Sequence, residues 1–138
     1  MIAREQYISH PSQIPICLES TEGFNATSSE PLSYGGLRCR WKSKITVGRF
    51  LHISLPDLSP DFFADCQVIW RRAVDSGYEL GLVFLDRNQA YKMRMLEQIC
   101  HISCYQQWIY EQEGRELDSE EAASEWIDRF AGRFPQVL

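Results

Sequence analysis

The sequence predicts a β-rich body followed by helices. Between Ile14 and Leu85, short apolar or alternating segments are separated by clusters of Gly, Pro, Ser and Asp at hairpin-like distances, which is typical of strands. Near Arg87 the hydrophobic period changes from two to about 3.6. The chain then contains no proline or glycine until Gly114, so a long helix is expected there.

Length and composition favour one soluble domain over residues 1–138, with a β-rich part at 6–86 and a helical extension at 87–138. The formal net charge of -5 disfavours DNA or RNA as a partner. No apolar run approaches the roughly 20 residues that cross a bilayer, so we expect no membrane insertion. Five cysteines without a CxxC pair or a preceding secretory signal indicate reduced thiols in the cytoplasm.

Five segments have the pattern of strands: residues 14–18, 37–42, 50–55, 66–72 and 78–85. Pro15 places the first of them at a sheet edge, because proline cannot donate to a ladder. Apolar and basic residues alternate along 37–42, so one face of this strand should enter the core. The last two segments predict a hairpin across Asp75-Ser76-Gly77, and residues 21–31 predict a loop or a weak strand.

The helical extension predicts two helices. Asp118 followed by Glu121 is the pattern of an N-terminal capping box, so the second helix should begin there and end near Pro135. One face of the first helix combines Leu96, Ile99, Cys100, Ser103 and Gln107, widened by Met95, Ile102 and Ile109. The apolar stripe of the second consists of Ala123, Trp126, Ile127, Phe130, Ala131 and Phe134. The wide surface of the first helix predicts contact with two neighbours.

A recognisable order of motifs runs through the β-rich part. The turn Ser33-Tyr34-Gly35-Gly36 precedes a strand, Val68-Ile69-Trp70 follows in another, and the segment 77–85 closes the body before a helix. Over residues 6–86 this order resembles the PilZ domain. The resemblance implies a six-stranded antiparallel β-barrel and, in typical members, binding of the bacterial second messenger cyclic di-GMP.

The resemblance also locates the motifs that bind this dinucleotide. The family's Arg-x-x-x-Arg motif falls on Glu5 and Ser9, so neither arginine is present. In the Asp/Asn-x-Ser-x-x-Gly motif, Ser33 and Gly36 match, whereas Pro31 stands at the Asp/Asn position. We therefore expect weak or no binding of cyclic di-GMP, and a protein partner in motility, pilus or signalling systems.

Substitute basic residues offer an alternative, a receptor for cyclic di-GMP or another anionic nucleotide. The candidate nucleotide site consists of Ser33, Gly36, Arg4, Arg38 and Arg40. A tight turn at the glycines and a solvated basic strand face explain the same residues without a ligand. Trp70 likewise fits either hairpin packing or stacking on a base.

Metal and catalytic chemistry are not expected, and neither is a cofactor. Cys100 and Cys104 share a helix face, but His101 is rotated away and no second pair completes a tetrahedral set. The three histidines have no nucleophile elbow or paired acid, so we expect a non-enzymatic protein. Trp108 and Tyr110 lie on different helix faces, so either the second helix covers them or the tail joins subunits in a homo-oligomer.

Overall fold

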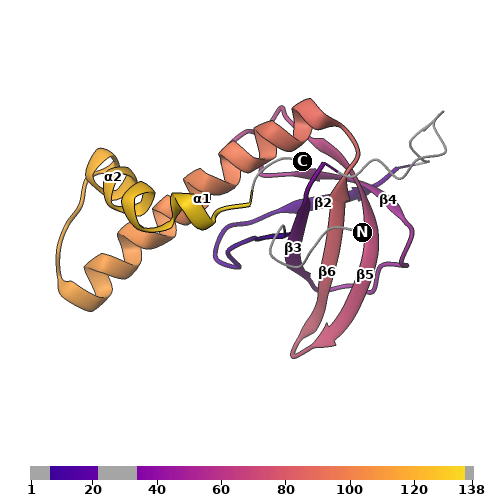
Figure 1. Cartoon of the computed structure of the whole chain (residues 1–138). Coiled ribbons are helices and arrows are strands. Elements are labelled where there is room, and N and C mark those ends of the chain that lie inside the picture. The colour runs from indigo at the N-terminus through magenta and orange to yellow at the C-terminus, as the bar shows by residue number, and fades with distance from the viewer. Residues whose placement is uncertain (1–6, 22–33, 136–138) are drawn as a thin grey trace.

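The computed structural model describes residues 7–21 and 34–135 (Figure 1). Its strands are β1 (Tyr7–Ser9), β2 (Cys17–Ser20), β3 (Gly36–Trp41), β4 (Phe50–Ser54), β5 (Ala64–Val74) and β6 (Gly77–Phe84). Its helices are α1 (Arg87–Glu113), α2 (Ser119–Phe130) and the short 3₁₀ helix η2 (Ala131–Arg133). The β-rich body therefore precedes the helices, as the change of hydrophobic period predicts.

The strands form one open sheet in the order β1-β3-β6-β5-β4-β2. β1 runs parallel to β3, and the remaining neighbours are antiparallel. Within the described residues, the two edge strands β1 and β2 do not pair with each other. The sheet has the six strands that the resemblance implied, but the expectation of a closed, wholly antiparallel barrel is wrong.

The connection between β1 and β2 explains why the edges stay apart. Pro11 and Pro15 lie in it and carry no backbone N–H for a ladder. The amide of His10 donates instead to the carbonyl of Arg38 at 2.9 Å, and the amide of Ile14 closes a turn onto Pro11 at 3.1 Å. These bonds hold the connection beside β3 rather than in a ladder between β1 and β2.

The strand expected at residues 14–18 is shifted in the structure. β2 begins at Cys17, so Pro15 precedes the strand, and the edge position predicted from it is confirmed for β2. β1 was not predicted, since its three residues are too few to show an alternating pattern. Residues 22–31 of the expected loop lie outside the described residues.

The hairpin of β5 and β6 is confirmed. Val74 pairs with Gly77, and the turn places Ser76 at φ 68° and Gly77 at φ 151°. A Cβ on Gly77 would lie 2.6 Å from the Trp41 carbonyl oxygen, so glycine is also needed for this close approach. The register shifts between Val68 and Trp70, which marks a bulge in β5.

Helix α1 begins and ends where the sequence predicts. The side chain of Asp86 accepts from the Gln89 amide at 2.8 Å, and Gly114 ends the helix in the left-handed conformation at φ 67°. Its first half packs on the sheet through Ala90 and Met93, and its second half extends beyond the sheet, where α2 lies alongside it (Figure 1). The prediction that this helix contacts two neighbours is confirmed.

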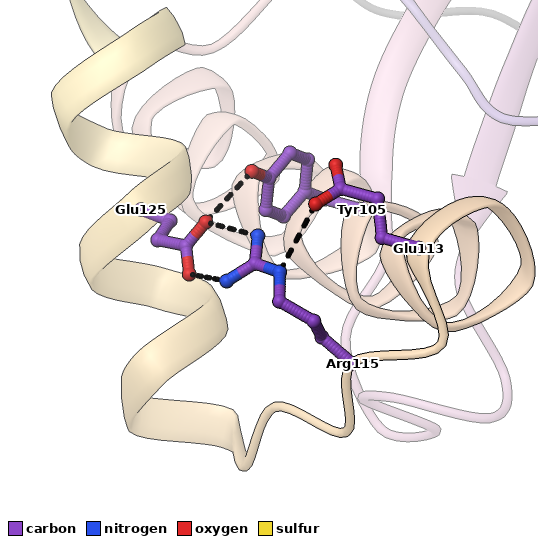
Figure 2. A network of polar contacts seen from close by, with 4 residues as sticks. All are labelled: Tyr105, Glu113, Arg115 and Glu125. Carbon is purple, nitrogen blue, oxygen red and sulfur yellow. Dashed lines mark hydrogen bonds and ion pairs between the residues drawn. The ribbon is translucent and has the colours of Figure 1, made fainter.

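A polar network fastens α2 to the end of α1 (Figure 2). The Arg115 guanidinium donates to both carboxylate oxygens of Glu125 at 3.1 Å, and its Nε donates to Glu113 at 3.1 Å. The Tyr105 hydroxyl adds a 3.0 Å bond to Glu125. The hydrogen bonds from Arg115 hold the pKa of Glu125 below its ordinary value.

The buried helix faces differ in part from the predicted ones. Ile99 is 47% exposed, and Ser103 and Gln107 are also exposed, whereas the unexpected Met93, Glu97 and Tyr105 are buried. In α2 the buried residues are Ala122 and Trp126, while Ile127 and Phe130 are exposed. The buried face of α1 differs from the predicted one because α1 has two neighbours. The sheet and α2 cover different sides of this helix and leave the side between them open.

Candidate ligand-binding face

The outward face of β1, β3, β6 and β5 holds the predicted site residues that the structure describes. Along β3, Leu37 and Cys39 point into the core, so Gly36, Arg38 and Arg40 occupy the opposite face. Arg4 and Ser33, and the motif positions Glu5 and Pro31, lie outside the described residues. The face is therefore built from β3 and its neighbours.

Two aromatic rings meet across this face. Tyr7 on β1 is in register with Gly36, and Trp70 on β5 is in register with Gly81. Their ring centroids lie 6.0 Å apart, edge to face. Since neighbouring strands are about 4.8 Å apart, both side chains must reach inward over β3 and β6 to meet. We call this pair, Tyr7 and Trp70, the aromatic bridge.

Gly81 and the bulge in β5 make the aromatic bridge possible. A Cβ on Gly81 would stand 2.1 Å from the indole of Trp70, so the ring occupies the space that any other residue would fill. Tyr7 is buried at 8% exposure, and this burial raises the pKa of its hydroxyl, with Trp70 offsetting part of the shift through a side-chain hydrogen bond. The bridge is a packed part of the fold.

Arg38 lies on the same face, in register with Ser9 on one side and Gly81 on the other. Its side chain is half-buried, and its Nε is a buried donor without a hydrogen-bond partner among the residues that the structure describes. An unpartnered guanidinium N–H is one of the few polar groups that a fold leaves unsatisfied, and it can bind an anion. Of the described candidates, Arg38 has the strongest chemical reason to contact a ligand.

Arg40 lies at the other end of β3. It is exposed and lines a groove of about 400 Å³ with Lys42, Trp41 and Tyr78. At about 3.4 Å per residue, four residues separate it from Gly36 by roughly 14 Å. Gly36, Arg38 and Arg40 thus follow one another along the same face of β3, and Arg38 lies between the other two, roughly 7 Å from each.

The glycine turn before β3 pairs with the end of β6. Gly35 has φ 127°, and its carbonyl accepts from the Phe84 amide at 3.1 Å. The Tyr34 amide donates to the Phe84 carbonyl at 3.3 Å. These bonds favour the structural explanation of the glycine pair, a tight entry into the strand.

His101 and His52 each contact residues other than the cysteines of α1. The Nε2 of His101 lies 2.8 Å from the Ser9 carbonyl oxygen, so His101 points to β1, as its rotated helix position predicts. The Nε2 of His52 lies 3.0 Å from Asp65, and its ring stacks on Phe63. Cys100, however, lies beside residues that sequence reasoning did not connect with it.

The sequence did not identify two residues that the structure places at these sites, Tyr7 and Glu97. Tyr7 belongs to a strand of three residues, which gives no readable period. Glu97 is fully buried in α1, between the buried Met93 and Cys100. The spacing of these three residues, i, i+4 and i+7, puts an acid in the middle of an apolar helix face, and this signal could have identified it.

The fold and the outward face define a small β-rich domain with a C-terminal helical extension. Residues 3–101 match the PilZ domain, which is more than half of the chain, and the chain therefore belongs to the PilZ domain family. No curated protein and no solved structure matches the chain. In the described part of the chain, none of the helices combines the length and apolar character needed to span a bilayer.

Proposed function

We propose that this chain is a divergent PilZ-type regulatory or adaptor protein that acts by binding a protein partner, with weak or no affinity for cyclic di-GMP. The observation that carries the proposal is the aromatic bridge, because Tyr7 and Trp70 cover the outward face beside Gly36. By analogy with the family, its setting is the cytoplasm, in bacterial second-messenger signalling, motility or pilus systems.

The missing arginines support the same proposal. Arginine offers a planar fork of donors to phosphate or to a guanine edge, whereas Glu5 repels phosphate and Ser9 is too short to replace it. Each lost charge-assisted hydrogen bond removes about 1.5–3 kcal/mol, so losing both arginines weakens binding by several decades.

We assign the partner to the helical tail, the surface formed by the end of α1 and by α2. Trp108 and Tyr110 are 50% and 52% exposed at the end of α1, and exposed aromatic residues are common in protein interfaces. Eight acidic residues lie between positions 111 and 128: Glu111, Glu113, Glu116, Asp118, Glu120, Glu121, Glu125 and Asp128. This charge favours a basic partner surface. A second copy of the chain is the alternative occupant, through the basic residues of its β3.

One observation favours a second candidate function, that of a receptor for cyclic di-GMP or another anionic nucleotide. The Nε of Arg38 is buried and has no hydrogen-bond partner within residues 7–21 and 34–135, so an anion on this face would satisfy it. Arg38, with Arg4 and Arg40 as further donors, would then replace the missing arginine pair. Nucleotide binding on this face would require the aromatic bridge to open or to stack on a base.

Calorimetric titration with cyclic di-GMP separates the two functions. We expect no saturable heat at moderate or at low salt, where phosphate contacts are strongest. Saturable binding at micromolar or tighter affinity that Arg38→Ala abolishes would favour the receptor and reject the adaptor. Arg49→Ala, an exposed arginine in the loop before β4, is the matched control for loss of one positive charge.

Photo-crosslinking in the host cell tests the partner surface. A photoreactive phenylalanine analogue placed at Trp108 or at Tyr110 should capture the same discrete protein. The same analogue at Val47, which is 48% exposed in the loop before β4, should not capture it. Adducts that are identical at all three positions, or no adduct from the tail, would contradict the assigned surface.

A further inference from the structure

Three side chains from distant parts of the chain meet beneath the connection between β1 and β2. His10 belongs to this connection, and Glu97 and Cys100 lie one turn apart on α1. One ligand atom from each, a ring nitrogen, a carboxylate oxygen and a thiol sulfur, lie within 4.8 Å of one another. The side chains of His10 and Glu97 are 3% and 0% exposed, and Cys100 is fully buried.

The hydrogen bonds of His10 define its orientation in this cluster. Its Nε2 lies 2.7 Å from the Ile14 carbonyl oxygen, which can only accept, so Nε2 carries the hydrogen. Its Nδ1 lies 2.6 Å from Oε2 of Glu97, so a proton is shared between these two atoms. With Nε2 fixed by a backbone carbonyl, Nδ1 is the nitrogen available to a metal, which is the usual arrangement of a ligating histidine.

The second oxygen of Glu97 is the observation that points to a missing ligand. Oε1 is buried and has no hydrogen-bond partner among the described residues. A buried carboxylate oxygen without a partner is costly to maintain. A cation beside Glu97 would satisfy it.

We propose that His10, Glu97 and Cys100 form a binding site for a divalent transition metal, with zinc as the preferred ion. Nδ1 of His10, a carboxylate oxygen of Glu97 and Sγ of Cys100 supply the three ligands, and a water molecule takes the fourth position. This site is separate from the aromatic bridge and does not depend on the function proposed above.

The chemistry of the three donors favours zinc. A mixed set of imidazole, carboxylate and thiolate suits a borderline ion, and zinc binds all three at about 2.0–2.3 Å. Tetrahedral bonds of this length separate the ligand atoms by about 3.3–3.8 Å, so the pair of His10 and Glu97 must open by about 1 Å. Such a change is within the range of small side-chain rotations.

Charge balance also favours a divalent ion. Binding releases two protons to solvent, the one shared by His10 and Glu97 and the one on the Cys100 thiol. The product contains one neutral imidazole, one carboxylate, one thiolate and M²⁺, so its net charge is zero. A neutral cluster is the least costly state for a site with this degree of burial.

A route to the site lies beside it. A groove of about 330 Å³ runs between the connection and α1, lined by Gln13, Ile14, Cys104 and Trp108 among others. Since Ile14 also accepts the hydrogen bond from His10, a movement of this segment would expose the cluster. A bound metal would in turn fasten the connection, and with it β1, to α1.

The test is a titration of chelator-treated, reduced full-length protein with Co²⁺, followed by absorption. We expect one Co²⁺ per chain, with a near-ultraviolet charge-transfer band from one thiolate, and displacement by Zn²⁺, which binds such sites more tightly. Cys100→Ser should remove the band, and Glu97→Gln should weaken binding at least tenfold. Cys66→Ser, which changes another buried thiol, and Cys17→Ser, at the sheet edge, should retain both the band and the affinity.

Each other outcome overturns the proposal. The site does not exist if no saturable band forms, if the band survives Cys100→Ser, or if Cys17→Ser removes it. Where Cys100→Ser fails to fold by circular dichroism, X-ray absorption at the zinc edge of the wild-type protein decides. One sulfur at about 2.3 Å with lighter ligands near 2.0 Å supports the site. Two or more sulfurs, or none, reject it.

Discussion

The indole ring of Trp70 lies over the backbone of Gly81, where a Cβ atom would stand 2.1 Å from the ring. The same ring meets Tyr7 edge to face, so the absence of a side chain at Gly81 fixes the position of the aromatic bridge. The bridge covers the outward face next to Gly36. Gly81 therefore governs whether that face is open to a ligand.

Gly81→Ala is therefore expected to displace Trp70. The added methyl group overlaps the ring and forces it away from Tyr7, which should lower the free energy of unfolding by about 1–3 kcal/mol. Chemical denaturation monitored by circular dichroism measures the change. Gly132→Ala is the matched control, because nothing lies within 4 Å of a Cβ at that position.

A double-mutant cycle assigns the effect to the ring. In a Trp70→Ala background, Gly81→Ala should cost far less than in the wild-type protein, since the clash has been removed. Equal costs in both backgrounds would show that the added methyl group acts on another part of the sheet.

His10→Ala is expected to be strongly destabilising in metal-free protein. Burial lowers the pKa of His10, but the hydrogen bond and charge of Glu97, with the Ile14 carbonyl, raise it more, so the net shift is upward. Removing the imidazole leaves the buried carboxylate of Glu97 without its partner, which should cost about 3 kcal/mol or more. Urea denaturation near neutral pH with a chelator present measures this change.

The pair of His52 and Asp65 provides the control. It has a similar separation, 3.0 Å, but its side chains are 31% and 22% exposed. His52→Ala should therefore cost less than about 1 kcal/mol through this pair. If the two substitutions had equal costs, burial would not be the reason for the contribution of His10.

Much of the fold was predictable because its signals are local. The helix limits at Asp86 and Gly114, the capping box at Asp118 and the turn at Ser76 each depend on a few adjacent residues. The open sheet was not predictable in this way. An open or a closed sheet depends on whether β1 pairs with β3 alone or also with β2. The alternation of side chains specifies only which residues face the core.

The candidate site was predictable only in part for the same reason. Gly36 and Arg38 were identified from a motif and from alternation along one strand. Tyr7 and Trp70 come from strands that are separated by two others, and His10 and Glu97 are 87 positions apart. Contacts of this kind follow from the arrangement of strands in space, which no local pattern contains.

Asp118→Ala is expected to weaken the start of α2. The Asp118 side chain accepts from the Glu121 amide at 2.8 Å, and the Glu121 side chain accepts from the Asp118 amide at 3.0 Å. Loss of this reciprocal cap should cost about 1 kcal/mol and should increase amide hydrogen exchange in α2 but not in α1. Ser119→Ala, at the next exposed position, should leave exchange unchanged. Faster exchange throughout α1 would mean that the two helices unfold together.

The stability of the protein should fall in alkaline solution, in part because of Cys39. Burial, followed by the charges of Glu97 and Glu79, raises the pKa of this thiol to about 12 from an ordinary value near 9.0. A raised pKa in the folded state means that the unfolded chain loses the proton first as the pH rises. The stabilising contribution is thus complete below about pH 9 and is lost as the pH rises toward 12.

Cys39→Ala should reduce this alkaline loss. One such thiol contributes a slope of up to about 1.4 kcal/mol per pH unit between the two pKa values, and the substitution removes that part of the slope. Denaturation at a series of pH values from 7 to 11 measures it. Between pH 7 and 8 the two proteins should show parallel curves, since the thiol is protonated in both states. Parallel curves up to pH 11 would instead show that Cys39 ionises as readily in the folded protein as in the unfolded chain.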